Sequence, residues 1–497
     1  MTRLSNLIQH VQEALEYKQM PKNADPNQEP TSRMKVIEAV LRRGKPANTD
    51  DLPSMMEEMT AFFEEFKNSD YFVDYSSEDY YRFLDLRDKP QARVVVIGDI
   101  HCDYYALSAL LLKLSVSSYD YFENAFFVFL GDYLDRGSAL FEPLLLLMDL
   151  KRILGDRMIM LRGNHELIDY DEIGQKLESK VIPQDSCPVL NEYCGDNKDF
   201  LKAFGYFYKT LPTYVYLKVA DQNVLLTHGA VPRQIFLDCF SFNQTNGSME
   251  FDSKYLYDQT REARQKTADD LLSSMTKILT SNLLRTRNKI LNDMIWGDPS
   301  TDKEKYQVSG RYQFGSSQFE AYAQKNNISR MFRSHEPVDF GYESFFDNRL
   351  YTVFSTGGAL NDQAGYGDIN PAFAVVKNDG SYFIENSFIY KIELCETLPV
   401  ICNLFSEDVL NFKQSSECSV NDEFICDGQM ALEVESVFSR LKDSFNAPEE
   451  NDEAESEAPV AEEPETPEKA ETPEEPETLK ELEMPEEPEE KCANPEE

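Results

Sequence analysis

The 497-residue sequence lacks the features that mark membrane-spanning and classically secreted proteins. No stretch approaches the roughly 20 apolar residues that a helix needs to cross a bilayer, and the N-terminus, MTRLSNLIQHVQEALEY, has no apolar run of the signal-peptide type. The nine cysteines are scattered without a Cys-x-x-Cys pair, which favours free thiols in a reducing compartment. These absences predict a cytoplasmic protein without a membrane span, while the nucleus and secretion without a cleaved signal stay open.

Positive charge is also scarce. The net charge is −40, of which residues 448–497 supply −19 (22 Asp and Glu against 3 Lys), leaving −21 for residues 1–447. Because an acidic surface repels the phosphate backbone, we expect no nucleic-acid partner.

The composition divides the chain into four regions. Residues 1–88 have apolar residues at helical spacing and are expected to form a helical N-terminal region. Residues 89–394 are expected to form the main folded domain. Residues 395–447 are expected to be a helical C-terminal extension. The Pro- and Glu-rich residues 448–497 predict a disordered acidic tail. The tail has three interpretations: a solvated extension, an autoinhibitory segment or a docking segment. Regulatory proteins could bind the N-terminal helices or this tail.

From Arg93 onward, short apolar runs alternate with helical stretches. VVVIGD, FFVFLGD and MIMLRGN each predict a buried strand with polar residues at its carboxyl end, and the helical segments between them indicate a parallel α/β layer. Further strands are expected at 213–218, 223–228, 350–355, 372–378 and 381–384. Two segments look inserted: residues 169–198, polar and loop-rich, and residues 233–290, with a charged helical stretch.

Residues that commonly bind metals follow several of these strands. Because the carboxyl ends of parallel strands share one edge, the side chains there should meet. Four of the five histidines lie at strand ends, which is difficult to explain by packing alone. Oxygen and imidazole ligands without thiolates suit two divalent ions such as Mn, Fe or Zn, with Mn expected to work in vitro. The residues concerned are Asp99, His101, Asp132, Asp135, Asn164, His165, His228 and His335.

Five motifs in this order resemble the phosphoprotein phosphatases, the metal-dependent serine/threonine phosphatases. They are GDIH at 98–101, GDYLDRG at 131–137, RGNHE at 162–166, THGA at 227–230 and RSHEPVDFGYE at 333–343. IWGDP at 295–299, YQFG at 312–315 and YTVFS at 351–355 also resemble landmarks of that family. The resemblance covers roughly residues 90–390. It implies a four-layer metallophosphoesterase sandwich, in which two packed β-sheets are flanked by helices. It also implies that phosphoserine and phosphothreonine in phosphoprotein substrates are hydrolysed by in-line attack of a metal-activated hydroxide.

The resemblance also implies a role for each residue. Asp99 and His101 would bind the first metal, Asp132 would bridge both metals, and Asn164, His228 and His335 would complete the second. His165 would be the general acid, oriented by Asp135. Arg136 would bind the substrate phosphate, and Arg311 is the candidate for a second phosphate-binding arginine, although its spacing to the YQFG motif is shorter than in the family.

The sequence departs from the family at Cys102, Asp103 and Ala230, and at STGGALND after the last motif strand. Three alternatives therefore stay open: a dinucleoside polyphosphate hydrolase, a phosphotyrosine phosphatase, and a non-catalytic scaffold. The scaffold is disfavoured because the sequence retains a ligand-type residue at all six metal-ligand positions.

Overall fold

The helices and strands that the computed structural model describes all lie in its main compact unit, Met1–Asn446. The described residues are 31–43, 51–67, 80–137 (without 116 and 118), 139–181, 184–252, 287–301, 312–358 and 365–387. Arg311, the first 30 residues of the predicted helical region 1–88, and the regions predicted at 395–447 and 448–497 lie outside them.

The first sheet has the order β17-β16-β2-β3-β4. Strands β2, β3 and β4 run parallel, and β16 pairs antiparallel with β2. Helices α4 and α6 connect the parallel strands, so the expected strand–helix–strand layer is confirmed. The bounds are β2 Arg93–Ile97, α4 Tyr104–Ser115, α5 Tyr121–Asn124, β3 Ala125–Phe129, α6 Phe141–Leu154, β4 Met158–Met160, β16 Ala372–Lys377 and β17 Tyr382–Asn386.

The second sheet has the order β1-β7-β8-β13-β15-β14. Its central strands β8, β13 and β15 are parallel, whereas β7 and β14 join antiparallel. The bounds are β1 Tyr81–Asp85, β7 Tyr214–Val219, β8 Gln222–Thr227, β13 Arg330–Arg333, β14 Tyr342–Phe345 and β15 Leu350–Val353.

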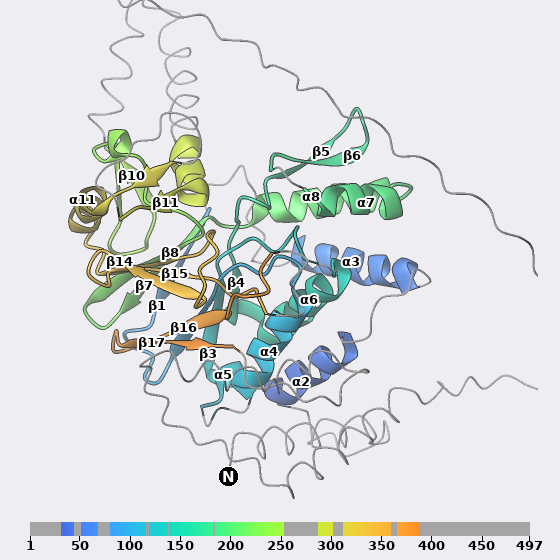
Figure 1. Ribbon diagram of the computed structural model, residues 1–497, viewed down its shortest axis with the longest axis horizontal. Helices are drawn as coiled ribbons and strands as arrows, with labels where there is room; N and C mark the ends of the chain where they lie inside the picture. Colours follow the sequence, from blue (N-terminus) through green and yellow to red (C-terminus); the bar gives the residue numbers. More distant parts are fainter. Residues whose placement is uncertain are drawn as a thin grey trace, which may run out of the picture. The chain divides into compact units, whose positions relative to one another are not determined.

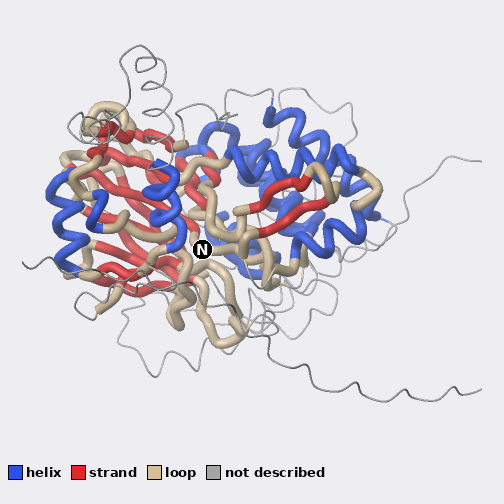
Figure 2. The backbone as a smooth tube through the Cα atoms, turned by 90° about the horizontal axis from the view of Figure 1, so that it is seen from above, coloured by secondary structure: helices blue, strands red, loops and turns tan. Residues whose placement is uncertain are grey.

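The two sheets pack face to face with helices outside them. Successive side chains of β2 point to opposite faces: Val94 and Val96 belong to the core between the sheets, whereas Val95 and Ile97 pack with the outer helices. Burying each such side chain stabilises the fold by about 1.5–3 kcal/mol. Helices α2, α4 and α6 lie on one side of the strands and α11 on the other (Figure 1), with strands between helical regions in the second view (Figure 2). The four-layer metallophosphoesterase sandwich is confirmed.

The remaining described elements lie outside the two main sheets. Residues 287–296 are helical, and the charged helical stretch predicted before them lies outside the described residues. The bounds are α2 Ser32–Arg43, α3 Leu52–Lys67, β5 Ile168–Asp171, β6 Lys176–Ser179, α7 Ser186–Cys194, α8 Lys198–Thr210, β9 Phe240–Phe242, β10 Met249–Phe251, β11 Asp298–Pro299, β12 Gln313–Phe314 and α11 Ser316–Asn326, with short 3₁₀ turns at Gly155–Arg157 and Gln234–Phe236.

Two expectations about local structure were wrong. Residues 81–85, expected in a helical region, form β1, which pairs with β7 more than 130 residues later. Residues 169–198 are not mainly loop, because they form the β5–β6 hairpin and α7, with Leu177 and Leu190 buried against the outer helices. In both cases tertiary pairing supplied partners that local composition did not reveal.

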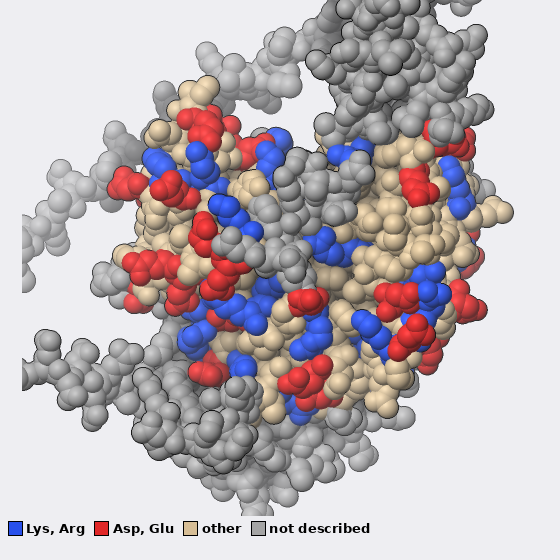
Figure 3. All heavy atoms as spheres, turned by 180° about the vertical axis from the view of Figure 1, so that it is seen from behind, with Lys and Arg blue, Asp and Glu red and all other residues tan. Residues whose placement is uncertain are grey.

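The described surface carries charges of both signs. On the face in Figure 3, Lys and Arg side chains are interspersed with Asp and Glu. Ion pairs such as Arg152–Glu65 and Lys209–Asp169 occur at the described surface. Within the described residues, no helix combines the length and apolarity needed to cross a membrane.

Candidate metal centre

The loops at the carboxyl ends of the strands hold strained backbone conformations. The φ angles of His101, Asp132, Asp135, Arg136 and His335 are 42°, 54°, 66°, 71° and 77°. Left-handed values at non-glycine residues cost about 1–3 kcal/mol each, so surrounding contacts must hold them. One such contact is the carbonyl of Asp132, which accepts the N–H of His101 at 2.8 Å. All five residues are candidate site residues predicted from the sequence.

Two glycines allow the loops after β3 and β4 to touch. A Cβ atom on Gly163 would lie 2.1 Å from Asp132 Oδ1, and one on Gly131 would lie 2.4 Å from the nitrogen of Gly163. Both distances are far below van der Waals contact. The glycines of the GDYLDRG and RGNHE motifs therefore bring Asp132 against the Asn164 loop.

Glu166 fastens these two loops together. Its fully buried carboxylate accepts the N–H groups of Asp132 at 2.7 Å, Tyr133 at 2.8 Å and Gly163 at 2.9 Å. Burial and the nearby charge of Asp132 raise the pKa of Glu166 to about 8. Glu166 was not among the predicted functional residues, although its place in the RGNHE motif was a signal.

The first ligand group consists of Asp99, His101 and Asp132, all buried. The Nδ1 of His101 lies 2.9 Å from the carbonyl of Leu134, which can only accept, so Nδ1 carries the proton. Its Nε2 then faces the carboxylates, 3.5 Å from Asp99 Oδ2 and 3.7 Å from Asp132 Oδ2. This tautomer leaves Nε2 available to a metal.

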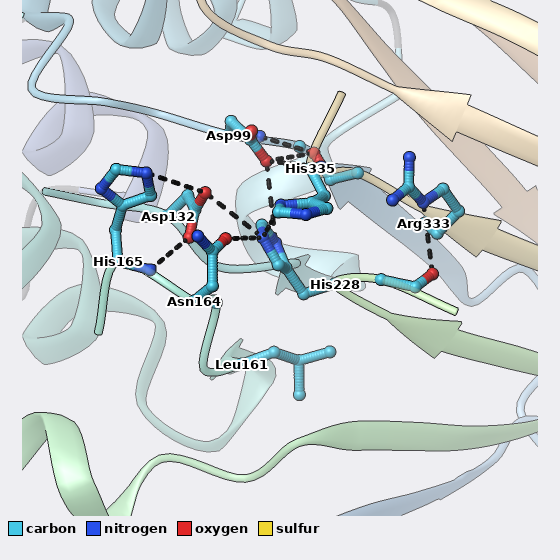
Figure 4. Close-up of polar contacts among 12 residues, drawn as sticks. Asp99, Asp132, Leu161, Asn164, His165, His228, Arg333 and His335 are labelled. Atoms are coloured by element: carbon cyan, nitrogen blue, oxygen red, sulfur yellow. Dashed lines mark hydrogen bonds and ion pairs between the residues drawn. The ribbon is translucent and has the colours of Figure 1, made fainter. Parts of the chain in front are cut away.

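The second ligand group consists of Asp132, Asn164, His228 and His335, which converge in Figure 4. The Nε2 of His228 lies 3.2 Å from Asp132 Oδ2, 3.0 Å from Asn164 Oδ1 and 3.1 Å from His335 Nδ1. Ligands at about 2.1 Å from one ion and at right angles to each other lie about 3.0 Å apart, so this spacing suits a shared ion.

The amide of Asn164 fits two orientations. In the reverse orientation its NH₂ group lies within hydrogen-bonding distance of Asp132, His228 and His335. Metal binding requires the orientation in which Asn164 Oδ1, rather than the NH₂ group, faces His228.

The buried donors fit two divalent cations. Asp99 Oδ2 and His228 Nδ1 are buried and have no hydrogen-bond partner among the described residues, which is costly unless a ligand is bound. Burial alone would lower the pKa of His101, but Asp99 and Asp132 raise it to about 9. The carboxylates thus attract positive charge to this site, and the oxygen and imidazole donors suit Mn, Fe or Zn.

His165 lies beside the first ligand group. Its Nδ1 donates to Asp135 Oδ2 over 2.7 Å, and its Nε2 is 4.0 Å from Asp132 Oδ2. The ligand atoms of His101, Asp132 and His165 lie within 4.8 Å of one another, as do those of Asp132, His228 and His335. Asp132 is common to both sets, as a bridging ligand requires. Proximity alone leaves His165 as either a ligand or a proton donor, and metal content distinguishes the two.

Asp135 is held as a charged group. Burial by itself would raise its pKa, but hydrogen bonds from His165 and from the N–H groups of Ser186 and Asp185 lower the pKa below the usual value. A charged Asp135 keeps the proton of His165 on Nδ1 and leaves Nε2 facing the ligand groups.

Arg136 and Tyr366 border the first ligand group. Arg136 is exposed, and its guanidinium lies near the hydroxyl of Tyr366. Burial raises the pKa of Tyr366 to about 12, although the positive charge of Arg136 acts to lower this pKa. The ring of Tyr366 stacks on His101 with centroids 5.8 Å apart. Tyr366, which follows the altered STGGALND segment, was not among the residues predicted from the sequence.

Two of the departures from the family pattern contact each other. Asp103 Oδ1 accepts the N–H of Ala106 in α4 at 2.9 Å, and its Oδ2 accepts the hydroxyl of Thr356 at 2.7 Å and the N–H of Gly357 at 3.0 Å. Asp103 thus joins the first-sheet loop to the start of STGGALND. Cys102 is buried, and burial raises the pKa of its thiol.

The second-sheet histidine His335 is supported by a buried ion pair. Arg333, which has no exposed surface, donates to Asp298 Oδ1 over 2.8 Å and to the carbonyl of Gly297 over 2.9 Å. The neighbouring Ser334 contacts Asp99, which also accepts the N–H of His335 at 3.1 Å. Arg333 and Asp298 lie in motifs that resemble the family, but neither was predicted to have a role.

Comparison with known proteins gives one family match. The family described as "Calcineurin-like phosphoesterase" matches residues 92–339. These residues include every described candidate site residue, so the match covers the centre described above.

Curated relatives are similar over about half of the chain. The chain is 28% identical over 265 residues to the "Serine/threonine-protein phosphatase 6 catalytic subunit" of Caenorhabditis elegans, covering 53% of this chain and 64% of that protein. It is 27% identical over 272 residues to the "Serine/threonine-protein phosphatase PP2A-like PPG1" of Saccharomyces cerevisiae, covering 53% and 61%. The chain therefore spans less than two thirds of either relative. These matches agree with the resemblance indicated by the motifs.

A solved structure from Saccharomyces cerevisiae, described as a protein serine/threonine phosphatase with similarity to human phosphatase PP5, covers 71% of this chain and 93% of its own. It is 18% identical to this chain, with a TM-score of 0.44.

Proposed function

Because residues 92–339 belong to the calcineurin-like phosphoesterase family, we propose that this chain is a metal-dependent phosphatase of phosphoserine and phosphothreonine in proteins. One observation carries the proposal: two ligand groups share Asp132 beside the hydrogen-bonded pair His165–Asp135. A carboxylate shared by two histidine groups suits a two-metal centre, and the adjacent imidazole suits proton transfer to a leaving group.

The proposed ligands are those of the two groups. Asp99, His101 and Asp132 hold one divalent ion, while Asp132, Asn164, His228 and His335 hold the other. Bound there, the two ions supply the positive charge that stabilises a transferring phosphoryl group and lower the pKa of water. The native metals are proposed to be Mn, Fe or Zn.

The protein side chains perform the remaining steps. The exposed guanidinium of Arg136 binds the phosphate, because a planar group with several N–H donors matches phosphate oxygens. His165 donates a proton from Nε2 to the leaving oxygen, since its Nδ1 proton is held by Asp135. Arg311 keeps its proposed role as a second phosphate ligand.

The biological setting is part of the same proposal. Phosphoproteins are the substrates, and regulatory proteins bind through the N-terminal helices or the acidic tail. The protein acts in the cytoplasm, in line with four buried free cysteines among the described residues.

A substrate panel tests the reaction. Metal-stripped protein is assayed with and without Mn on matched phosphoserine, phosphothreonine and phosphotyrosine peptides and on a dinucleoside polyphosphate. We expect Mn-dependent hydrolysis of the first two peptides. Asp132→Asn is the control for a contaminating phosphatase and should be inactive on all of them.

Other results separate the alternatives. Preference for phosphotyrosine or the dinucleotide would replace the proposed substrate class while keeping the metal chemistry. The proposal would be overturned if protein shown by metal analysis to contain no metal kept full activity. It would also be overturned if protein with two bound metals hydrolysed none of the substrates.

A further inference from the structure

Helix α7, in the segment interpreted as an inserted loop, begins against the His165–Asp135 pair. The Oδ1 of Asp135 accepts the N–H of Asp185 at 2.9 Å and that of Ser186 at 2.8 Å. In return the N–H of Asp135 donates to Ser186 Oγ over 2.8 Å. Asp135 therefore accepts N–H groups at the start of α7 that have no partner within the helix.

The residue that should cap α7 is used elsewhere. Asp185 is at the N-cap position, yet its side chain makes no capping hydrogen bond to its own helix. Its carboxylate instead accepts the N–H of Arg136 at 3.1 Å. Two carboxylates are thus exchanged: Asp135 caps α7, and Asp185 binds the backbone beside Asp135.

We propose that Ser186 and Asp185 are positioning residues that hold the His165–Asp135 pair and Arg136 in their working geometry. This inference rests on the proposed function and assigns a role to the inserted segment 169–198.

The backbone strain explains why such support is needed. Asp135 and Arg136 are consecutive residues with φ of 66° and 71°, a conformation that is unfavourable for non-glycine residues and persists only when neighbouring groups hold it. The Ser186 and Asp185 contacts supply that support, because one binds the N–H of Asp135 and the other the N–H of Arg136.

The contact between Asp135 and the start of α7 also fixes the direction of the His165 imidazole. With Oδ1 of Asp135 held by two N–H groups of α7, Oδ2 remains to accept the Nδ1–H of His165 at 2.7 Å. If the carboxylate turned, His165 would lose the partner that directs Nε2 towards the substrate. Proton donation should then suffer more than metal binding.

The test compares two leaving groups in the metal-loaded protein. A phosphoserine peptide releases a poorly acidic alcohol and needs the proton of His165, whereas 4-nitrophenyl phosphate releases an acidic phenol and needs it much less. We expect Ser186→Ala to lower kcat about tenfold for the peptide and less than about threefold for 4-nitrophenyl phosphate. Metal content should stay unchanged.

Control variants separate positioning from general loss of structure. Ser186→Thr keeps the hydroxyl and should restore most of the activity on the peptide. Ser115→Ala removes another buried hydroxyl, which donates to Leu112 at 2.7 Å within α4, and should affect neither substrate. In a His165→Asn background, Ser186→Ala should cause no further selective loss, because both changes act through the same proton.

A second measurement does not depend on activity. The Nδ1 proton of His165 is observed by NMR in the protein loaded with diamagnetic Zn and is identified by its disappearance in His165→Asn. Ser186→Ala should shift or broaden this resonance, and Ser115→Ala should leave it in place.

The outcomes separate the inference from the proposed function. Equal loss on both substrates, or an unchanged imidazole resonance in a folded Ser186→Ala protein, would overturn the positioning role. If the wild-type protein hydrolyses neither substrate, the proposed function fails, while the resonance still decides whether Ser186 holds His165.

Discussion

The two sheets contribute to the candidate metal centre in different ways. Each of the first-sheet loops after β2, β3 and β4 delivers at least two functional side chains within a short motif, such as Asp99 and His101 after β2. The loops after β8 and β13 deliver one histidine each, His228 and His335. Each first-sheet motif therefore supplies several functional side chains from one short segment, whereas the two second-sheet histidines come together through the pairing of β8 with β13.

The supports of the two halves differ in the same way. Glu166 fastens the first-sheet loops with three backbone hydrogen bonds to residues of its own motif and the preceding one. His335 depends on Arg333, whose partner Asp298 is 35 residues away. Among the described residues, only Asp132 belongs to both sets of converging ligand atoms.

Replacing that shared residue should have the largest effect. Asp132→Asn keeps the size of the side chain but removes the charge shared by the two ligand groups. We expect loss of essentially all activity and of both metals, measured by elemental analysis of the folded protein. Retention of two tightly bound metals would contradict a bridging role.

His165→Asn tests the first-sheet half alone. If His165 donates a proton, kcat should fall by about 10²–10⁴-fold while two metals remain bound. The measurement pairs phosphopeptide kinetics with metal analysis. Loss of one metal would instead make His165 a ligand, as its place near His101 and Asp132 allows.

Arg333→Met tests the support of the second-sheet half. Removing one partner of a buried ion pair leaves Asp298 without its guanidinium and typically costs about 3–5 kcal/mol. We expect a lower Tm and weaker binding of one metal of the two. Arg330→Met on the same strand removes a partly exposed arginine over the Tyr382 ring and should cost about 1 kcal/mol or less. Equal destabilisation by both variants would remove the special role of Arg333.

Thr356→Val tests a contact that joins the two halves. Thr356 follows β15 of the second sheet and donates to Asp103 of the first-sheet loop. Losing this buried hydrogen bond should lower the free energy of unfolding by about 1–2 kcal/mol. We also expect KM for a phosphopeptide to rise several-fold, with a smaller change in kcat. Thr60→Val is the same substitution at a partly buried hydroxyl of α3, which donates to Met56 of its own helix, and should leave both constants unchanged.

Removing the acidic tail should have the smallest effect. Residues 448–497 carry a charge of −19 with few apolar residues, so burial cannot offset their ordering entropy. Salt screens exposed charge over about 8 Å at physiological ionic strength. A chain ending at Asn446 should keep its fold and its activity on a small aryl phosphate at low and high salt. A severalfold, salt-sensitive increase would identify the tail as autoinhibitory.

The sequence by itself determined the α/β class and the positions of the candidate ligands. An apolar run followed by Gly-Asp or Gly-Asn is a local pattern, and parallel strands oblige residues after successive strands to meet at one edge. For this reason the pattern of residues alone groups Asp99, Asp132 and Asn164. Their roles as ligands remain predictions that metal analysis must test.

Only the tertiary structure decided which residues support that centre. Tyr81–Asp85 became a strand through pairing with β7, and Ser186 reached Asp135 through the packing of an inserted helix. Arg333 and Asp298 stand in separate motifs, and their ion pair exists only after β13 and β11 are brought together. Such contacts depend on side chains distant along the chain, and local periodicity carries no information about them because it reports only which face of an element is buried.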